Sequence, residues 1–168
     1  MANGPRFAVR FRRRREGKTN YQKRLKFLQS SSPRLVVRKS NNFITIQFIA
    51  FDPKGDKTLL TVNSAKLKDF GWNHSCKNIP AAYLAGLLAG KLAKQAKVTK
   101  ANADIGLHSA TKGARVLAVV KGAADAGLQI SLNSEAIVPD RIEGKHISLF
   151  RKVDVSKDFQ STKEKIVK

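Results

Sequence analysis

The apolar residues of this chain follow two different periods, and the change between them near residue 70 constrains the fold more than any other feature. Before it, apolar positions alternate with others, as where Ile44, Ile46 and Phe48 take every second place. Such alternation is typical of a strand with one buried face. After residue 79 the apolar residues recur at helical spacing, for example at Leu84 and Leu88. The chain is therefore predicted to begin its domain with strands and to continue with helices.

The part before the change predicts three strands joined by short turns. We place the strands at 35–38, 44–50 and 58–62, with turns at 41–42 and 52–56 that are rich in Asn, Asp, Pro and Gly. Connections this short join antiparallel neighbours. The first half of the domain is thus expected to be an antiparallel meander.

The part after the change predicts helices that alternate with strands. A helix is expected from Pro80 to about Lys97, a strand over 103–107, a second helix from residue 112 or 113, and a last strand over 128–132. Two successive β-α-β units imply parallel strands joined by right-handed crossovers. The order β-β-β-α-β-α-β therefore predicts an α/β domain with a mixed sheet covered by helices.

Small residues on the first of these helices, Gly86 and Gly90 among them, predict a close approach to another element, which we take to be the sheet. The loop before the helix contains Trp72, for which we expect a half-buried position where the loop meets the sheet.

The two ends of the chain differ from this central domain. Residues 1–32 are expected to be a basic arm, extended up to about residue 17 and followed by a short helix that Thr19 could cap. Residues 33–134 form the predicted domain. Residues 135–168 are polar and of mixed charge, with a weak helical signal only near 156–165.

Positive charge is concentrated in the arm. The chain has a net charge of +21, and its first 40 residues hold 13 Lys and Arg but a single acid, Glu16. Four arginines stand together at Arg12–Arg15, where their charges repel one another unless a polyanion neutralises them. Arginine suits phosphate because its planar fork can bond two oxygens at once. The arm therefore predicts a polyanionic partner, although an isolated basic run is more often a solvated surface.

A membrane is the less favoured polyanion. The longest apolar stretch, residues 79–90, has twelve residues, whereas a spanning helix needs roughly 20. The basic N-terminus is not followed by the apolar segment of a signal peptide, so we expect a cytoplasmic protein. The single cysteine, Cys76, cannot form an internal disulfide, and with His74 it supplies only two ligands, so no metal site is expected.

Catalysis is not predicted either. Asp104, His108 and Ser109 could suggest a catalytic set, but the chain has no nucleophile elbow. A two-metal nuclease needs several clustered carboxylates. Before residue 135 the chain has only six acids, which are Glu16, Asp52, Asp56, Asp69, Asp104 and Asp125. We expect Asp104 to accept hydrogen bonds from the loop that follows it, and we expect no enzymatic activity and no cofactor.

Several segments, in this order, resemble the family of large-subunit ribosomal proteins that bind 5S ribosomal RNA, in its archaeal and eukaryotic branch. These segments are residues 11–21, 33–41, 71–72, 78–90, 104–109, 121–128, Pro139, 141–142 and 144–147. The resemblance covers about residues 4–150, and the length fits the archaeal form. It implies a three-layer α/β/α fold of the ribonuclease-H-like type. It also implies a place in the central protuberance of the ribosome, with 5S and large-subunit ribosomal RNA and neighbouring ribosomal proteins as partners, and neither DNA nor a membrane.

The candidate RNA-binding residues combine the arm with residues of the domain. Phe7, Phe11 and Tyr21 could stack on unpaired bases, although packing against the domain is an equal alternative. A general RNA-binding, assembly or processing factor stays open as the alternative function. The candidates are Arg6, Arg10, Arg12, Arg13, Arg14, Arg15, Lys18, Thr19, Asn20, Tyr21, Lys23, Arg24, Arg34, Arg38, Lys39, His74, Lys77 and His108.

Overall fold

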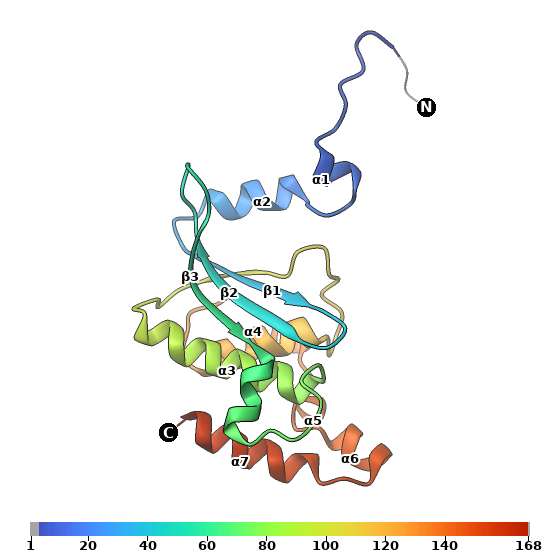
Figure 1. Ribbon diagram of the computed structural model, residues 1–168, viewed down its shortest axis with the longest axis vertical. Coiled ribbons are helices and arrows are strands. Elements are labelled where there is room, and N and C mark those ends of the chain that lie inside the picture. Colours follow the sequence, from blue (N-terminus) through green and yellow to red (C-terminus); the bar gives the residue numbers. More distant parts are fainter. Residues whose placement is uncertain (1–3, 168) are drawn as a thin grey trace.

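A mixed four-stranded sheet forms the centre of the computed structural model, which describes residues 4–167 (Figure 1). The strands are β1 (Arg34–Lys39), β2 (Ile44–Ala50), β3 (Lys57–Asn63) and β4 (Asn102–Asp104), in the order β3-β2-β1-β4. The first three pair antiparallel and β4 runs parallel to β1. The predicted meander and mixed sheet are therefore confirmed. The first three residues of the predicted arm and Lys168 of the predicted tail lie outside the described residues.

One face of the sheet carries the core. Ile44, Ile46 and Phe48 of β2 are fully buried, and their neighbours along the strand are only partly covered. They pack with Leu35 and Val62 of the adjoining strands against the helices below. The alternation read from the sequence is therefore the burial pattern of the strand.

Two helices, α3 (Ile79–Gln95) and α4 (Arg115–Asp125), cover this face and lie against each other. A Cβ on Gly86 of α3 would come closer than 3.0 Å to the backbone of Val119, and one on Gly122 of α4 would meet the backbone of Tyr83. The prediction that the small residues of α3 face the sheet was wrong. Gly86 and Gly90 permit close contact between the two helices, since a Cβ on Gly90 would likewise meet Ala123 of α4.

The arm lies over the opposite face of the sheet, so helices flank the sheet on both sides (Figure 1). It contains one helical turn, α1 (Arg12–Arg15), and the helix α2 (Tyr21–Leu28), neither of which buries a residue. The expectation of extended chain up to residue 17 is corrected at α1, since arginine is a good helix former. Asn20, not Thr19, caps α2, with its side chain accepting a hydrogen bond from the amide of Lys23 at 3.0 Å.

The predicted last strand, 128–132, is reduced to a single bridge between Lys100 and Gln129. Gln129 donates its amide to the Thr99 carbonyl at 2.9 Å and accepts the amide of Ala101 at 3.2 Å. The chain then turns away at Asn133, which caps the short helix η2 (Ser134–Ala136). The prediction of a strand was therefore correct in its position and its parallel direction, but the predicted strand was too long.

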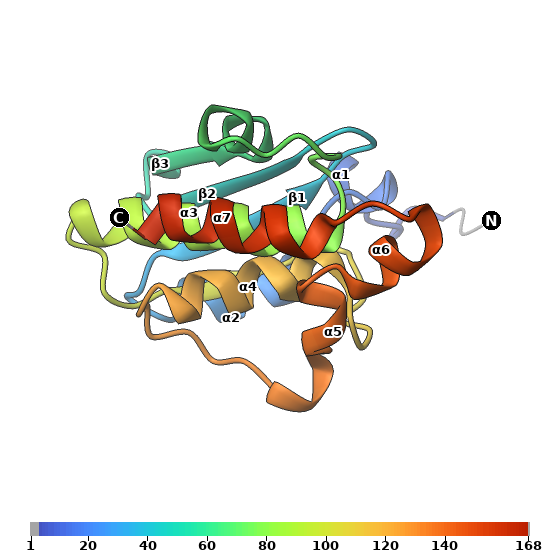
Figure 2. The ribbon, with the colours of Figure 1, turned by 90° about the horizontal axis from the view of Figure 1, so that it is seen from below.

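The C-terminal part is helical, with α5 (Pro139–Ile142), α6 (Lys145–Arg151) and α7 (Val155–Val167). Figure 2, seen from below, shows α7 running across α3 on the side away from the sheet. Val155, Phe159, Thr162 and Ile166 of α7 are buried, one or two turns apart. The weak helical signal near 156–165 is thus confirmed and belongs to a core-forming helix.

The loop between β3 and α3 begins with the 3-10 helix η1 (Ser64–Phe70), which sequence reasoning missed, and contains Trp72. Trp72 is only 1% exposed, so the prediction that it would be half-buried was wrong. Its indole Nε1 donates to the Ser75 carbonyl at 3.3 Å, which satisfies the polar atom and allows the ring to be enclosed. Over residues 4–167, every helix is too short or too polar to cross a bilayer.

Candidate nucleic-acid interface

The arm presents its arginines to solvent. All four arginines of α1 are exposed, and no acidic residue stands in this turn. Glu16, just behind it, lies 2.8 Å from Lys18 and 3.8 Å from Arg12. Ion pairs this exposed contribute little to stability. A single carboxylate cannot neutralise the arm, so most of the arm's positive charge is available to a partner.

Local contacts hold α1 against the start of α2. Arg13 donates from Nε to Thr19 Oγ1 at 2.8 Å, and the rings of Phe11 and Tyr21 lie 5.6 Å apart at an angle of 53°. Phe11 is nonetheless 75% exposed, and Phe7 is also largely exposed. Neither phenylalanine belongs to the core, which favours the stacking interpretation for both, while Thr19 and Tyr21 order the arm.

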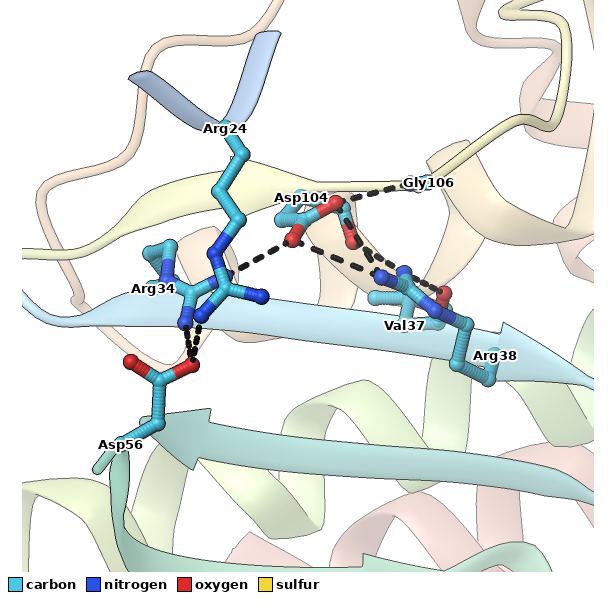
Figure 3. A network of polar contacts seen from close by, with 7 residues as sticks. All are labelled: Arg24, Arg34, Val37, Arg38, Asp56, Asp104 and Gly106. Atoms are coloured by element: carbon cyan, nitrogen blue, oxygen red, sulfur yellow. Dashed lines mark hydrogen bonds and ion pairs between the residues drawn. The ribbon is translucent and has the colours of Figure 1, made fainter. Parts of the chain in front are cut away.

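A network of three arginines and two aspartates connects the arm to the sheet (Figure 3). Arg34 of β1 lies 2.6 Å from Asp56 and 3.4 Å from Asp104, and Arg24 of α2 reaches the same oxygen of Asp56 at 2.9 Å. Arg38 donates to the backbone carbonyl of Asp104 at 2.9 Å and lies 3.4 Å from its carboxylate. The network joins α2, β1, β4 and the turn before β3.

Burial separates the roles of the two arginines on β1. Arg34 is 6% exposed, so its charge depends on the two aspartates, and its Nε has no hydrogen-bond partner among residues 4–167. Arg38 keeps 45% of its side chain exposed. Both arginines lie on the face predicted for them, yet only Arg38 is placed to contact a partner directly. An RNA contact by Arg34 stays a prediction.

Asp104 serves the fold. Its Oδ1 accepts the amide of Gly106 at 2.8 Å, which confirms the expected hydrogen bond from the loop after its strand. Its carboxylate also accepts from Arg34 and Arg38. Both carboxylate oxygens of Asp104 are therefore engaged in holding the arm-side face of the sheet and the loop after β4. Within residues 4–167, no three His, Cys, Asp or Glu side chains gather where they could hold a metal ion.

Four of the predicted residues from distant segments meet at one cavity of about 680 Å³. Lys39 ends β1, His74 and Lys77 come from the loop before α3, and His108 follows β4. Some of the arm candidates line a separate hollow together with Arg34 and Arg38. These arm residues are Arg13, Lys18, Thr19, Asn20, Lys23 and Arg24. Because Arg38 and Lys39 are consecutive, the two groups of candidate residues adjoin at the end of β1.

The list of candidate RNA-binding residues omitted the other basic residues of this cavity, which are Arg115, Arg141, His146 and Arg151. They lie on α4, α5 and α6, up to 36 positions apart in the sequence, and form no local run. Residues 135–168 are of mixed charge, so Arg141 and Arg151 do not stand out there as a basic segment.

The histidines of the cavity have different surroundings. His74 approaches Asp158 of α7 at 2.7 Å, and its ring meets the edge of Trp72. Burial lowers the pKa of His108, and the charges of Lys39, Arg38 and Arg115 lower it further. Burial, followed by the charge of Arg141, likewise lowers the pKa of His146. Two neutral imidazoles therefore sit in a field of positive charge.

The sequence was then compared with known proteins. The profile of the family described as "Ribosomal large subunit proteins 60S L5, and 50S L18" matches residues 5–102 and 91–133. A protein of Methanothrix thermoacetophila named "Large ribosomal subunit protein uL18" is 49% identical over 168 residues, covering 99% of both chains. A protein of the same name from Metallosphaera sedula is 46% identical, covering 90% of this chain and 78% of its own. One from Korarchaeum cryptofilum is 49% identical, covering 89% and 77%.

Proposed function

The chain belongs to the family of large-subunit ribosomal proteins that includes 60S L5 and 50S L18, and from this premise we propose that it binds 5S ribosomal RNA and helps to anchor it to the large-subunit RNA in the central protuberance. It is a constituent of the ribosome and not an enzyme. Ribosomal RNA and ribosomal proteins are accordingly its partners.

The exposed arginine turn α1 is the observation that carries the proposal. Its four guanidinium groups lie outside the core and outside the Arg34–Asp104 network. Within residues 4–167 their side-chain contacts are the Arg13–Thr19 hydrogen bond and the exposed Arg12–Glu16 pair, so most of this charge is available to a partner. Contacts between such groups and phosphates supply affinity and orientation, and the affinity falls as salt rises. The arm thus fits an RNA backbone.

In this proposal the protein distinguishes its RNA mainly by the shape of the RNA. The major groove of A-form RNA is too narrow for side chains to read, so RNA-binding proteins recognise backbone geometry and unpaired bases. The arm offers both kinds of contact, with the arginines for the backbone and the exposed rings of Phe7 and Phe11 for bases. The ion pair between Arg24 and Asp56 connects this surface to the sheet.

Exposed apolar residues support contacts with neighbouring ribosomal proteins. Leu149 and Phe150 of α6 are 83% and 89% exposed, which is costly in water for side chains of this size. We infer that a neighbouring protein covers them in the assembled subunit.

The test replaces Arg12–Arg15 by glutamine in the full chain and measures the affinity for 5S ribosomal RNA by filter binding over a range of salt. Each lost phosphate contact lowers the log–log salt slope by ~0.7–0.9, so the slope should fall by about 3. The matched control removes four lysines, Lys66, Lys68, Lys157 and Lys163, from η1 and α7 on the far side of the molecule (Figure 1).

The control variant is expected to keep the affinity and slope of the unmodified protein, and circular dichroism should show both variants folded. Unchanged binding by the α1 variant would refute the role of the arm. Equal affinity of the unmodified protein for an unrelated RNA of the same length would favour the general RNA-binding factor instead.

A further inference from the structure

Basic side chains line the cavity that lies between the loop before α3, the loop after β4 and α5–α6. All three histidines of the chain line it, together with five Lys and Arg side chains. No Asp or Glu of the described residues lines it. These basic residues are Lys39, Lys77, Arg115, Arg141 and Arg151.

Neighbouring acids do not neutralise these charges. Asp140 and Glu143 are both held by Lys145, at 2.7 Å and 3.0 Å. Asp158 contacts His74 at 2.7 Å and forms no ion pair with a Lys or Arg side chain of residues 4–167. Arg141 and Arg151 form no ion pair with any residue from 4 to 167. Positive charge gathered in a concave site without partners is costly unless an anion occupies it.

Polar groups of the walls suit the same kind of occupant. Ser109 and Thr111 place exposed hydroxyl groups at the rim, where each could donate a hydrogen bond. Ala114 and Arg115, at the start of α4, line the cavity, and the N-cap residue Ala114 provides no capping hydrogen bond from its side chain. Amide groups at an uncapped helix start favour an anion in addition to the side-chain charges. The buried Nδ1 of His146 has no partner within the described part of the chain.

We propose that this cavity is a second binding site for phosphodiester groups of RNA, separate from the surface of the arm. Phosphate fits because Arg141 and Arg151 offer planar forks that can each bond two oxygens, while the histidines and hydroxyls supply single bonds. A volume of about 680 Å³ exceeds what one phosphate fills, which favours several linked groups over a free ion. The inference rests on the proposed function only in taking RNA as the polyanion.

The position of the cavity would give the protein a second contact with RNA, next to that of the arm. Arg38 lines the hollow beneath the arm and the adjacent Lys39 lines the cavity, so the two basic surfaces meet at the end of β1. RNA bound at both would be held on either side of the sheet's edge, with its two contacts fixed relative to each other by β1.

The test follows the imidazole NMR signals of the three histidines in the full chain during titration with a short oligouridylate, and separately with inorganic phosphate. The cavity variant is Arg141→Gln with Arg151→Gln, both exposed and without ion pairs among residues 4–167. The matched control is Lys157→Gln with Lys163→Gln on α7. The α1 variant described above lacks the arginines of the arm, so binding at the cavity can be measured on its own.

Oligouridylate should shift the His108 and His146 signals in the unmodified protein, the control and the α1 variant. The cavity variant should lose these shifts, keep the free-state signals of His74 and His108, and show a salt slope smaller by about 1.4, since single strands contribute ~0.7 per phosphate. Unmoved histidine signals at saturation would overturn the proposal. So would shifts that survive in the cavity variant, or equal shifts with inorganic phosphate at the same phosphate concentration. Loss of 5S RNA binding by the α1 variant tests the arm independently.

Discussion

Replacing Gly86 by alanine tests the close approach of α3 to α4. A Cβ at this position would lie closer than 3.0 Å to three backbone atoms of Val119, including its carbonyl oxygen. Contacts of 3.4 Å or more are ordinary for a Cβ. The obstructing atoms belong to a helix backbone and cannot rotate away, so the two helices must move apart.

The magnitude follows from opposing effects. Alanine is better than glycine inside a helix by about 1 kcal/mol, which favours the variant. Overpacking a core costs ~1–3 kcal/mol, and moving the helices apart by ~0.5–1 Å forfeits between a quarter and a half of the dispersion attraction across the contact. Because the obstructing atoms are backbone atoms, the upper end of the overpacking cost applies, and we expect a net loss of about 2 kcal/mol in the free energy of unfolding. For a chain of this size that corresponds to a Tm lower by roughly 4–8 °C.

Thermal unfolding followed by circular dichroism measures this shift. Gly122→Ala should lower the Tm similarly, because its Cβ would meet the backbone of Tyr83 from the other side of the same contact. Gly4→Ala is the control, since nothing lies within 4 Å of a Cβ there. A Tm for Gly86→Ala equal to or above that of the unmodified protein would show that the helices do not approach as described.

Four other outcomes are expected. Asp104→Asn leaves the buried arginine beside it with one partner and should cost about 2 kcal/mol in urea unfolding, less than loss of a whole buried pair because Asp56 remains. Phe159→Ala should lower stability by ~3–4 kcal/mol in the same assay, since its ring is buried between α7 and α3; a value near zero would contradict the packing of α7. Asn20→Ala should speed amide exchange in α2, by weakening the cap by about 1 kcal/mol, without changing global unfolding. Because the folded-state pKa values of His108 and His146 are lowered, the unfolded chain takes up protons first, so the Tm should fall as pH drops below about 6.5, and replacing both histidines by glutamine should flatten that fall.

Local patterns predicted most of the sheet and the arm. The alternation around Ile46 and the turns on either side of β2 determine three strands, because each strand pairs with its neighbour in the sequence. The arginine run was recognised because its charges are consecutive. The same reasoning placed Arg34 and Arg38 on one face of β1, but it could not show that Asp56 and Asp104 hold Arg34 inside.

Contacts between distant segments account for what was missed. Glycine at position 86 indicates that another element packs closely against α3, but it does not identify that element. The cavity gathers Lys39, His108 and Arg141 from three separate elements, and no spacing in the sequence relates them. The helix α7 is mostly polar, so its narrow buried stripe gives a weak signal until α3 supplies a surface for it.

The helical turn α1 also limits the shape of what can surround it. Residues of an α-helix follow one another at 3.6 per turn, so the side chains of Arg12–Arg15 leave the axis in directions that together sweep most of a circle. A flat or convex polyanion could reach only the arginines on its own side. Arg13 is held toward α2 by Thr19, so an RNA that uses the other three arginines must contact the turn from more than one side, as at a junction of helices or in a folded loop.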